Sequence, residues 1–316
     1  MGTPTPLIMG SATGYTFGQI AHFVKSLRAT GYTGDLVLLT HDLSPEDAAA
    51  FVQYKVTAVP AEQTLRQCGD DFKYRRFHGR KWSKLHRSYF SVIDHLPLPR
   101  PTRDALLGRA NRLFHHIACS RYSYYLEYLK GPGKHYDQVI FADVRDVVFQ
   151  ADPFPAIADV ELGFALEPRH YCYGTGTPDD AWLKKLYGES EWETLHGKRT
   201  SCCGTLFGTR TALITYLEIM CREMARLSTT IMGYHGFDQA AHNFLWHRGA
   251  FGQPTRFENF DGPVFTMGTA KPESIRRNDN GELINEDGSV IAVLHQFDRH
   301  PELEEALLLK WSEAPY

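Results

Sequence analysis

The stretch Gln138–Phe154 reads QVIFADVRDVVFQADPF and is the most informative segment of the chain. Its apolar run Val139–Phe141 leads directly into two acids, Asp143 and Asp146. A strand that is buried on both faces reads as a continuous apolar run, so we expect a central strand of an α/β sheet here. Ligands of such sheets bind beyond the carboxyl ends of the strands. The stretch therefore predicts that both acids emerge at a metal and phosphate site.

An ordinary loop would explain the same two acids. In that alternative Asp143 caps a turn and Asp146 pairs with Arg145, because Asp is common in turns of any function. The sequence pattern alone leaves both interpretations open.

The segment resembles the nucleotide-sugar glycosyltransferases of the GT-A fold, in which a metal-binding DxD motif follows such a strand. The usual motif has one residue between its acids, whereas Asp143-Val-Arg-Asp146 has two, and Arg145 stands where the second acid is expected. Counting back from Asp152 places Asp146 at the position of that second acid. The resemblance implies a one-residue variant in which either acid could contact the metal directly.

Length and charge narrow the class of protein. A chain of 316 residues can bury a large core, and a formal net charge of -3 gives no electrostatic case for nucleic acid. We expect one GT-A-like domain over residues 1–316. The resemblance implies a nucleotide-sugar-binding half at 1–150 and an acceptor-binding half at 151–300, followed by a C-terminal helix at 301–316.

The opening and the cysteines bear on the compartment. The opening MGTPTPLIMGSATGY lacks a basic segment followed by a long apolar run, and no later run is long enough for a membrane helix. We expect a cytoplasmic protein, with peripheral contact at the inner face of a membrane left open. The six cysteines form no C-x-x-C pair, which favours free buried thiols over disulfides or zinc.

The first third of the chain alternates strands and helices. We expect strands at Leu7–Met9, Asp35–Thr40 and Lys55–Pro60, and a helix after the glycine-rich loop Gly10–Gly18 that ends at Gly31. This alternation predicts a parallel sheet. The loop is not G-x-G-x-x-G, so the pattern does not favour dinucleotide binding.

In the GT-A enzymes that the sequence resembles, the loop after the first strand lies against the nucleoside. The resemblance therefore implies that Gly10, Ala12 and Tyr15 bind the donor. Tyr15 could stack on a base or simply pack against the core.

Arg121 lies on the apolar stripe of a helical pattern between Asn111 and Lys130. An arginine on a core-facing stripe needs an anionic partner, because an unpaired buried charge is costly. A donor phosphate, a structural carboxylate and snorkelling to the surface are the three candidates. With Arg145, it is our candidate for fixed positive charge near the donor.

Two segments of the second half are interpreted from composition. We interpret Tyr171–Arg199 as a mobile connection near the acceptor side. Ser201–Gly208 reads as a small-residue turn that precedes a helix at Ala212–Met224, and it resembles a segment where GT-A backbones approach the sugar or acceptor. A plain glycine turn is the alternative.

Asp238 begins the pattern Asp238-Gln-x-x-x-Asn243. As a residue near a helix N-terminus it could be a cap. Several GT-A families carry an Asp-Gln with a following Asn, and that resemblance implies that Asp238 contacts the transferred sugar or acts on the acceptor.

His295 follows the apolar run Ser289–Leu294, which predicts a strand. GT-A enzymes often supply a C-terminal histidine as a metal ligand, so the resemblance implies that His295 completes a site with Asp143 and Asp146. Two carboxylates, one imidazole and diphosphate oxygens suit Mn2+ or Mg2+ better than Zn2+.

Two further segments are charged or amphipathic. Lys73–Arg87, KYRRFHGRKWSKLHR, contains no acid and is either a solvated helix face or a binding site for donor phosphates, an anionic glycan or a lipid phosphate. Pro301–Trp311 predicts an amphipathic helix that docks on the core.

The order of these features predicts a metal-dependent glycosyltransferase of polysaccharide biosynthesis, with a nucleoside-diphosphate sugar as donor and a glycan, lipid-linked or small-molecule acceptor. Inversion and retention are equally compatible with the sequence. The alternatives are a nucleotidyltransferase, although the loop Gly10–Gly18 carries no Lys or Arg, and a nucleotide-sugar or glycan binding module without catalysis.

Overall fold

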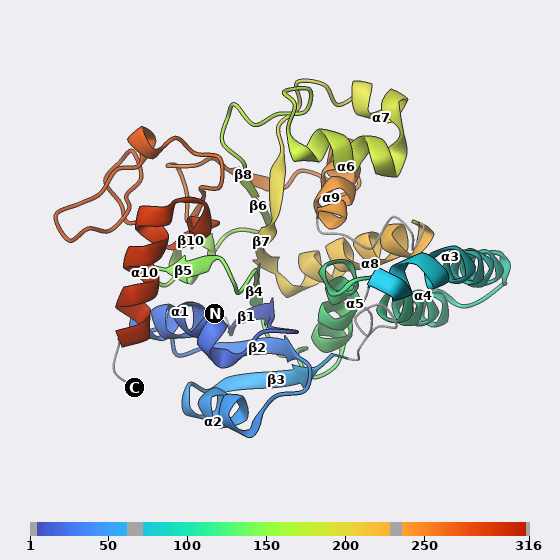
Figure 1. Cartoon of the computed structure of the whole chain (residues 1–316), viewed down its shortest axis with the longest axis horizontal. Helices are drawn as coiled ribbons and strands as arrows, with labels where there is room; N and C mark the ends of the chain where they lie inside the picture. The colour runs from blue at the N-terminus through green and yellow to red at the C-terminus, as the bar shows by residue number, and fades with distance from the viewer. Residues whose placement is uncertain (1–4, 62–71, 228–235, 314–316) are drawn as a thin grey trace.

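A seven-stranded, mostly parallel sheet forms the centre of the computed structural model, which describes residues 5–61, 72–227 and 236–313, with side chains described outside 72–83 and 312–313 (Figure 1). The strand order is β3-β2-β1-β4-β7-β6-β8, and only β7 runs against its neighbours. The strands are β1 (Pro6–Ser11), β2 (Asp35–Thr40), β3 (Val56–Pro60), β4 (Gln138–Ala142), β6 (Leu162–Leu166), β7 (Ser201–Thr209) and β8 (Thr255–Phe257).

Helices cover both faces of this sheet, which confirms the predicted α/β class. Successive residues of a strand point to opposite faces, so Ile8 packs with α1 whereas Leu7 and Met9 pack with α5 and α8. The helices are α1 (Phe17–Ala29), α2 (Pro45–Gln53), α3 (Phe72–His95), α4 (Arg100–Phe114), α5 (Ile117–Lys130), α6 (Pro178–Tyr187), α7 (Glu189–Glu193), α8 (Arg210–Arg226), α9 (Phe237–His247) and α10 (Pro301–Glu313).

A second, three-stranded sheet has the order β5-β10-β9 and lies beside α1 and α10 (Figure 1). Its strands are β5 (Val147–Phe149), β9 (Val264–Thr266) and β10 (Val293–His295). Because β5 follows β4 after a four-residue connection, and β10 pairs with β5, the end of the chain is brought to the loop that carries the two acids. The predicted strand Ser289–Leu294 is thus shorter and ends one residue later than expected.

The interpretation of Tyr171–Arg199 as a mobile connection is wrong. The segment contains α6 and α7 and builds its own buried cluster from Tyr173, Leu183 and Leu195. The Asp180 carboxylate organises the turn before α6, since it accepts hydrogen bonds from the backbone N–H groups of Gly174, Gly176 and Thr177 at 2.7–2.9 Å. The glycines that suggested mobility instead form a tight turn around one carboxylate.

Ser201–Gly208 is also not a turn, because it forms most of β7, buried between β4 and β6. The two glycines of this segment, Gly204 and Gly208, lie where neighbouring atoms leave no room for a Cβ. A Cβ on Gly208 would collide with the backbone of Glu161. The helix expected at Ala212–Met224 is confirmed as α8.

Other predicted elements are present with changed limits. The pattern between Asn111 and Lys130 is divided between α4 and α5, where His116 caps α5 by accepting from the Ala118 N–H at 3.2 Å. α10 docks on the core as predicted, with Leu303 and Trp311 buried beside Phe297. The basic segment Lys73–Arg87 lies within α3, and the predicted anion binding falls mostly on side chains outside the described residues.

Five cysteines are free among the described residues, and Cys68 lies outside them. Four of the five, Cys119, Cys202, Cys203 and Cys221, are buried. In the described part of the chain, no helix has the length and apolarity that crossing a membrane requires.

The asparagine of the Asp-Gln-x-x-x-Asn pattern ties α9 to the central sheet. Asn243 is fully buried, and its side-chain amide accepts from the Ser201 N–H and donates to the Ser201 C=O, both at 2.8 Å. A strand neighbour would make the same pair of bonds, so this side chain satisfies the first residue of β7.

We expect Asn243→Ala to lower the free energy of unfolding by about 2–4 kcal/mol, because it leaves a buried N–H and a buried C=O of Ser201 unpaired. Chemical denaturation measures this change. Asn278→Ala, whose side chain bonds only within its own surface turn, is the matched control and should cost less than about 1 kcal/mol. Equal stability of the two variants would contradict the role given to Asn243.

Candidate metal centre

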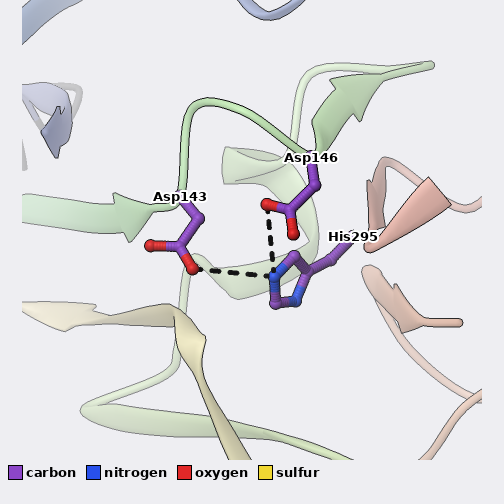
Figure 2. Close-up of side chains that lie close together, drawn as sticks. All are labelled: Asp143, Asp146 and His295. Atoms are coloured by element: carbon purple, nitrogen blue, oxygen red, sulfur yellow. Dashed lines mark ion pairs between the residues drawn. The ribbon is translucent and has the colours of Figure 1, made fainter. Parts of the chain in front are cut away.

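Asp143, Asp146 and His295 meet at the carboxyl end of β4 (Figure 2). Asp143 is the first residue after β4, and Asp146 immediately precedes β5. His295 is the last residue of β10 and pairs with Val147 of β5, so the pairing of these two strands places the imidazole beside Asp146. The backbone N–H of Gln296 donates to the Asp146 C=O at 2.7 Å and fixes this arrangement.

The spacing of the three side chains suits a shared cation. His295 Nε2 lies 3.9 Å from Asp143 Oδ2 and 3.8 Å from Asp146 Oδ1 (Figure 2). These distances exceed a hydrogen bond, whereas two ligands that each lie about 2.1 Å from one ion can be up to about 4.2 Å apart. The His295 and Asp146 side chains are buried, whereas that of Asp143 is 33% exposed, so the site opens to solvent on the Asp143 side.

Gly204 of β7 provides the space for this cluster. A Cβ there would lie 2.6 Å from His295 Nε2 and 2.7 Å from Asp143 Oδ2. The Gly204 C=O also accepts from the Asp143 N–H at 2.8 Å. The contacts of Gly204 are with the candidate metal ligands, and the predicted approach of this segment to a sugar or acceptor stays a prediction.

Arg121 of α5 bridges two of the candidate acids. One guanidinium nitrogen pairs with Asp143, and the other lies 3.1 Å from Asp238 Oδ2. Burial disfavours the charged form of Arg121, but Asp143 and other acidic neighbours outweigh burial and hold the pKa of the guanidinium well above its usual value. The sequence left a donor phosphate, a carboxylate and solvent as possible partners of Arg121. The structure shows the guanidinium paired with two carboxylates, those of Asp143 and Asp238.

Asp238 is not a helix cap, because Gly236 occupies the N-cap position of α9. Besides Arg121, its Oδ2 accepts from the Tyr122 hydroxyl at 3.4 Å and from the Cys203 thiol at 3.5 Å. No local pattern in the sequence pointed to these two donors, which come from α5 and β7. With Arg121 they hold the buried Asp238 carboxylate in place.

The Asp146 side chain is buried and lies next to several charged groups. Burial raises the pKa of its carboxyl group, His295 opposes this, and Asp143 adds to it. Arg145 lies 3.5 Å from Asp146 and 2.7 Å from Asp298, so the ion pair of the ordinary-loop alternative also exists. The Arg145 side chain remains 46% exposed at the mouth of the site.

The loop after β1 reaches the same region. Tyr15 is half-buried, and burial raises the pKa of its hydroxyl while Arg145 opposes the shift. Ala12 is buried, with its N–H bonded to the Leu39 C=O at 2.8 Å. A Cβ on Gly10 would lie 2.5 Å from Val144, so the lack of a side chain at Gly10 lets the loop that carries Asp143 and Asp146 pack onto β1.

A second acidic group, which was not expected from the sequence, lies at the same edge of the sheet and consists of Glu167 after β6 and Asp179 in α6. Asp179 accepts from the Tyr171 hydroxyl at 2.6 Å and from the Gln239 amide at 3.0 Å. Burial, together with the neighbouring Asp179, raises the pKa of Glu167 to about 8. The sequence offers no period or motif that would have paired these residues.

No protein-family model matches the sequence, and a search of curated proteins found no match either. Among solved structures, the chain is similar to core-mannan synthase A (CmsA/Ktr4) from Aspergillus fumigatus in its Mn/GDP form. That comparison has a TM-score of 0.36 and 12% sequence identity, and it covers 83% of this chain and 74% of that one. At this TM-score the similarity does not identify an activity.

We expect Gly204→Ala to weaken Mn2+ binding at least tenfold, because the added methyl group would occupy space between His295 and Asp143. Titration with Mn2+ followed by the electron paramagnetic resonance of the free ion measures the affinity. Gly18→Ala, at a helical position with open space around the added Cβ, should leave it unchanged. Unchanged affinity in the Gly204 variant would show that the ion binds elsewhere.

We expect Glu167→Gln to make stability less dependent on pH. The folded state holds the Glu167 proton up to a pKa of about 8, against 4.5 when exposed, so the stability present below pH 4.5 is lost as pH rises towards 8. The loss is on the order of 2–4 kcal/mol, and the Gln variant should escape it. Denaturant unfolding at pH 5 and pH 8 tests this, with exposed Glu161→Gln as control. Parallel pH curves for wild type and Glu167→Gln would contradict it.

Proposed function

We propose that the protein is a metal-dependent glycosyltransferase that moves a sugar from a nucleoside-diphosphate sugar to a glycan, lipid-linked or small-molecule acceptor. The observation that carries this proposal is the convergence of Asp143, Asp146 and His295 beside a buried arginine at the carboxyl edge of a parallel sheet. Ligands of such sheets bind at this edge. The resemblance of the sequence to GT-A enzymes supports the same reaction class.

The proposed metal ligands are Asp143, Asp146 and His295. Two oxygens and one nitrogen suit Mn2+, with Mg2+ as the second choice. When bound, such an ion acts as a Lewis acid on the diphosphate of the donor. Because Asp143 is the exposed member of the set, we propose that the donor phosphates approach from its side.

Breaking the bond between sugar and diphosphate leaves negative charge on the leaving group, and fixed positive charge stabilises it. Arg121 is already charged and held by two carboxylates, so it needs little reorganisation to act there. Arg145 is half-exposed at the mouth of the site and is the second candidate. We assign donor binding to both, together with the Tyr15 ring. Gly10 and Ala12 do not fit this role, because Gly10 is paired within the sheet to both β2 and β4, and Ala12 is buried with its N–H and C=O bonded inside the protein.

Asp238 is assigned to the transferred sugar or to the acceptor. Its carboxylate is fixed by Arg121, Tyr122 and Cys203, and a fixed carboxylate can orient a sugar hydroxyl or accept a proton from an acceptor hydroxyl. In this proposal residues 1–150 bind the donor and residues 151–300 bind the acceptor, with the C-terminal helix outside the site.

A thermal-shift screen tests the donor class. Purified protein is heated with UDP, GDP, CMP and their sugars, each with Mn2+, Mg2+ or chelator. A ligand at 100 times its dissociation constant stabilises by about 2.7 kcal/mol. A metal-dependent shift with one nucleotide family supports the proposal, and the same shift in the presence of chelator would contradict the metal site.

The same protein separates the alternatives by their products. A nucleotidyltransferase consumes a nucleoside triphosphate and releases pyrophosphate. A binding module forms a tight metal-dependent complex with the nucleotide sugar but neither hydrolyses nor transfers it. Either result would contradict the proposed glycosyltransferase activity and favour the corresponding alternative.

We expect Asp143→Ala and Asp146→Ala each to lower kcat/KM by at least 1,000-fold, equivalent to about 4 kcal/mol of transition-state stabilisation. Turnover of the donor identified by the screen measures this, and circular dichroism checks that the variants fold. Asp159→Ala, an exposed acid between β5 and β6, should keep wild-type activity. Wild-type turnover in either metal-site variant would overturn the assignment.

A further inference from the structure

His295 presents its two ring nitrogens to different surroundings. Nε2 faces Asp143 and Asp146 (Figure 2), whereas Nδ1 lies 3.7 Å from the sulfur of Cys202. The imidazole is 1% exposed, so water does not set its tautomer. A neutral histidine binds a cation through the nitrogen that carries no proton, and the group that accepts from the other nitrogen decides which one that is.

Cys202 is the group that faces Nδ1. Besides His295, its sulfur accepts from the Gln296 side-chain amide at 3.7 Å. The carboxyl group of Glu167, which follows the neighbouring strand β6, lies close enough for the two groups to shift each other's pKa, and its Oε2 is buried without a hydrogen-bond partner. If the thiol donates to the Glu167 carboxyl, the sulfur is left to accept from an Nδ1–H of His295, in the same way as it accepts from the Gln296 amide. Donation to an oxygen makes the sulfur a better acceptor, since hydrogen bonds in a chain polarise one another.

The backbone conformation of Gln296 and the space around its side chain both fit the contact of its amide with Cys202. Gln296 has a φ of 62°, a left-handed conformation that is uncommon for a non-glycine residue. A Cβ on Gly268 would collide with the Gln296 side-chain oxygen, so the glycine leaves room for this amide. Backbone strain held next to a candidate ligand by close packing is typical of functional sites.

The sulfur itself does not fit as a metal ligand. It lies 3.7 Å from Nδ1 of the imidazole, whereas the two carboxylates face Nε2, so the sulfur and the carboxylates lie against different nitrogens of the ring. Cys203, the next residue of β7, points to Asp238 instead, so the two adjacent cysteines contact different parts of the site.

From this geometry we infer that Cys202 and Glu167 are positioning residues for His295: they hold its proton on Nδ1 and so present an unprotonated Nε2 to the cation. This inference rests on the proposed metal site and adds to it the two groups behind the ligand. Neither residue contacts the ion or the substrate.

The first test is Mn2+ affinity, measured by the electron paramagnetic resonance of free Mn2+ without nucleotide. Cys202→Val keeps a side chain of similar volume but removes the acceptor, and should weaken binding about 10- to 100-fold. Cys202→Ser restores an acceptor and should recover most of the affinity. Cys221→Val removes an equally buried thiol in α8 and serves as control, with affinity as in the wild type.

Wild-type affinity in Cys202→Val would overturn the inference and leave the proposed metal site intact. An affinity equally weakened in Cys202→Ser would also overturn it, because acceptor chemistry would then be irrelevant. If the wild-type protein binds no Mn2+, both the inference and the proposed metal site fail.

The second test is independent of how well the variants fold. Nitrogen-15 NMR of histidine-labelled, metal-free wild-type protein reports which ring nitrogen of His295 carries the proton, with the signal assigned by its loss in His295→Gln. We expect the Nδ1–H tautomer. The Nε2–H tautomer would overturn the inference.

Discussion

A single guanidinium makes the acidic edge of the sheet possible. Asp143 and Asp238 belong to different elements, and Asp143 also lies beside the buried Asp146, so negative charge gathers here and needs a cation. Arg121 lies between them and pairs with each. An ion pair of this kind contributes little net stability, because desolvation offsets the attraction, but removal of one partner leaves an uncompensated charge. The ion pairs of Arg121 therefore fix the positions of the Asp143 and Asp238 side chains but add little to the free energy of unfolding.

The two sheets supply that geometry together. The parallel sheet delivers Asp143 at the end of β4, and the small sheet delivers His295 through the pairing of β10 with β5. The connection between β4 and β5 is too short to move independently of either sheet, and Gly10 and Gly204 allow it and its partners to pack closely on both sides. Rigid strands on several sides keep the three ligands within reach of one ion, which metal binding requires.

Features that depend on a local sequence pattern could be predicted from the sequence. The apolar run Val139–Phe141 identified the central strand, and the helical stripe placed Arg121 inward with an anionic partner. His295 came only from the resemblance, since no local period links it to residues nearly half the chain away. β7 was misread because burial between two strands, not the propensity of its small residues, makes it a strand. Glu167 and Cys202 become neighbours only through strand order, so no sequence period could pair them.

The position of His295 in the chain has a consequence for biosynthesis. Asp143, Asp146 and β5 are synthesised well before β10, and β10 can pair with β5 only after the long intervening segment has been made. A nascent chain that folds from its N-terminus therefore exposes two carboxylates without the imidazole that completes the set. If the candidate site binds an ion, coordination by all three side chains requires β10 to have been made and to have paired with β5.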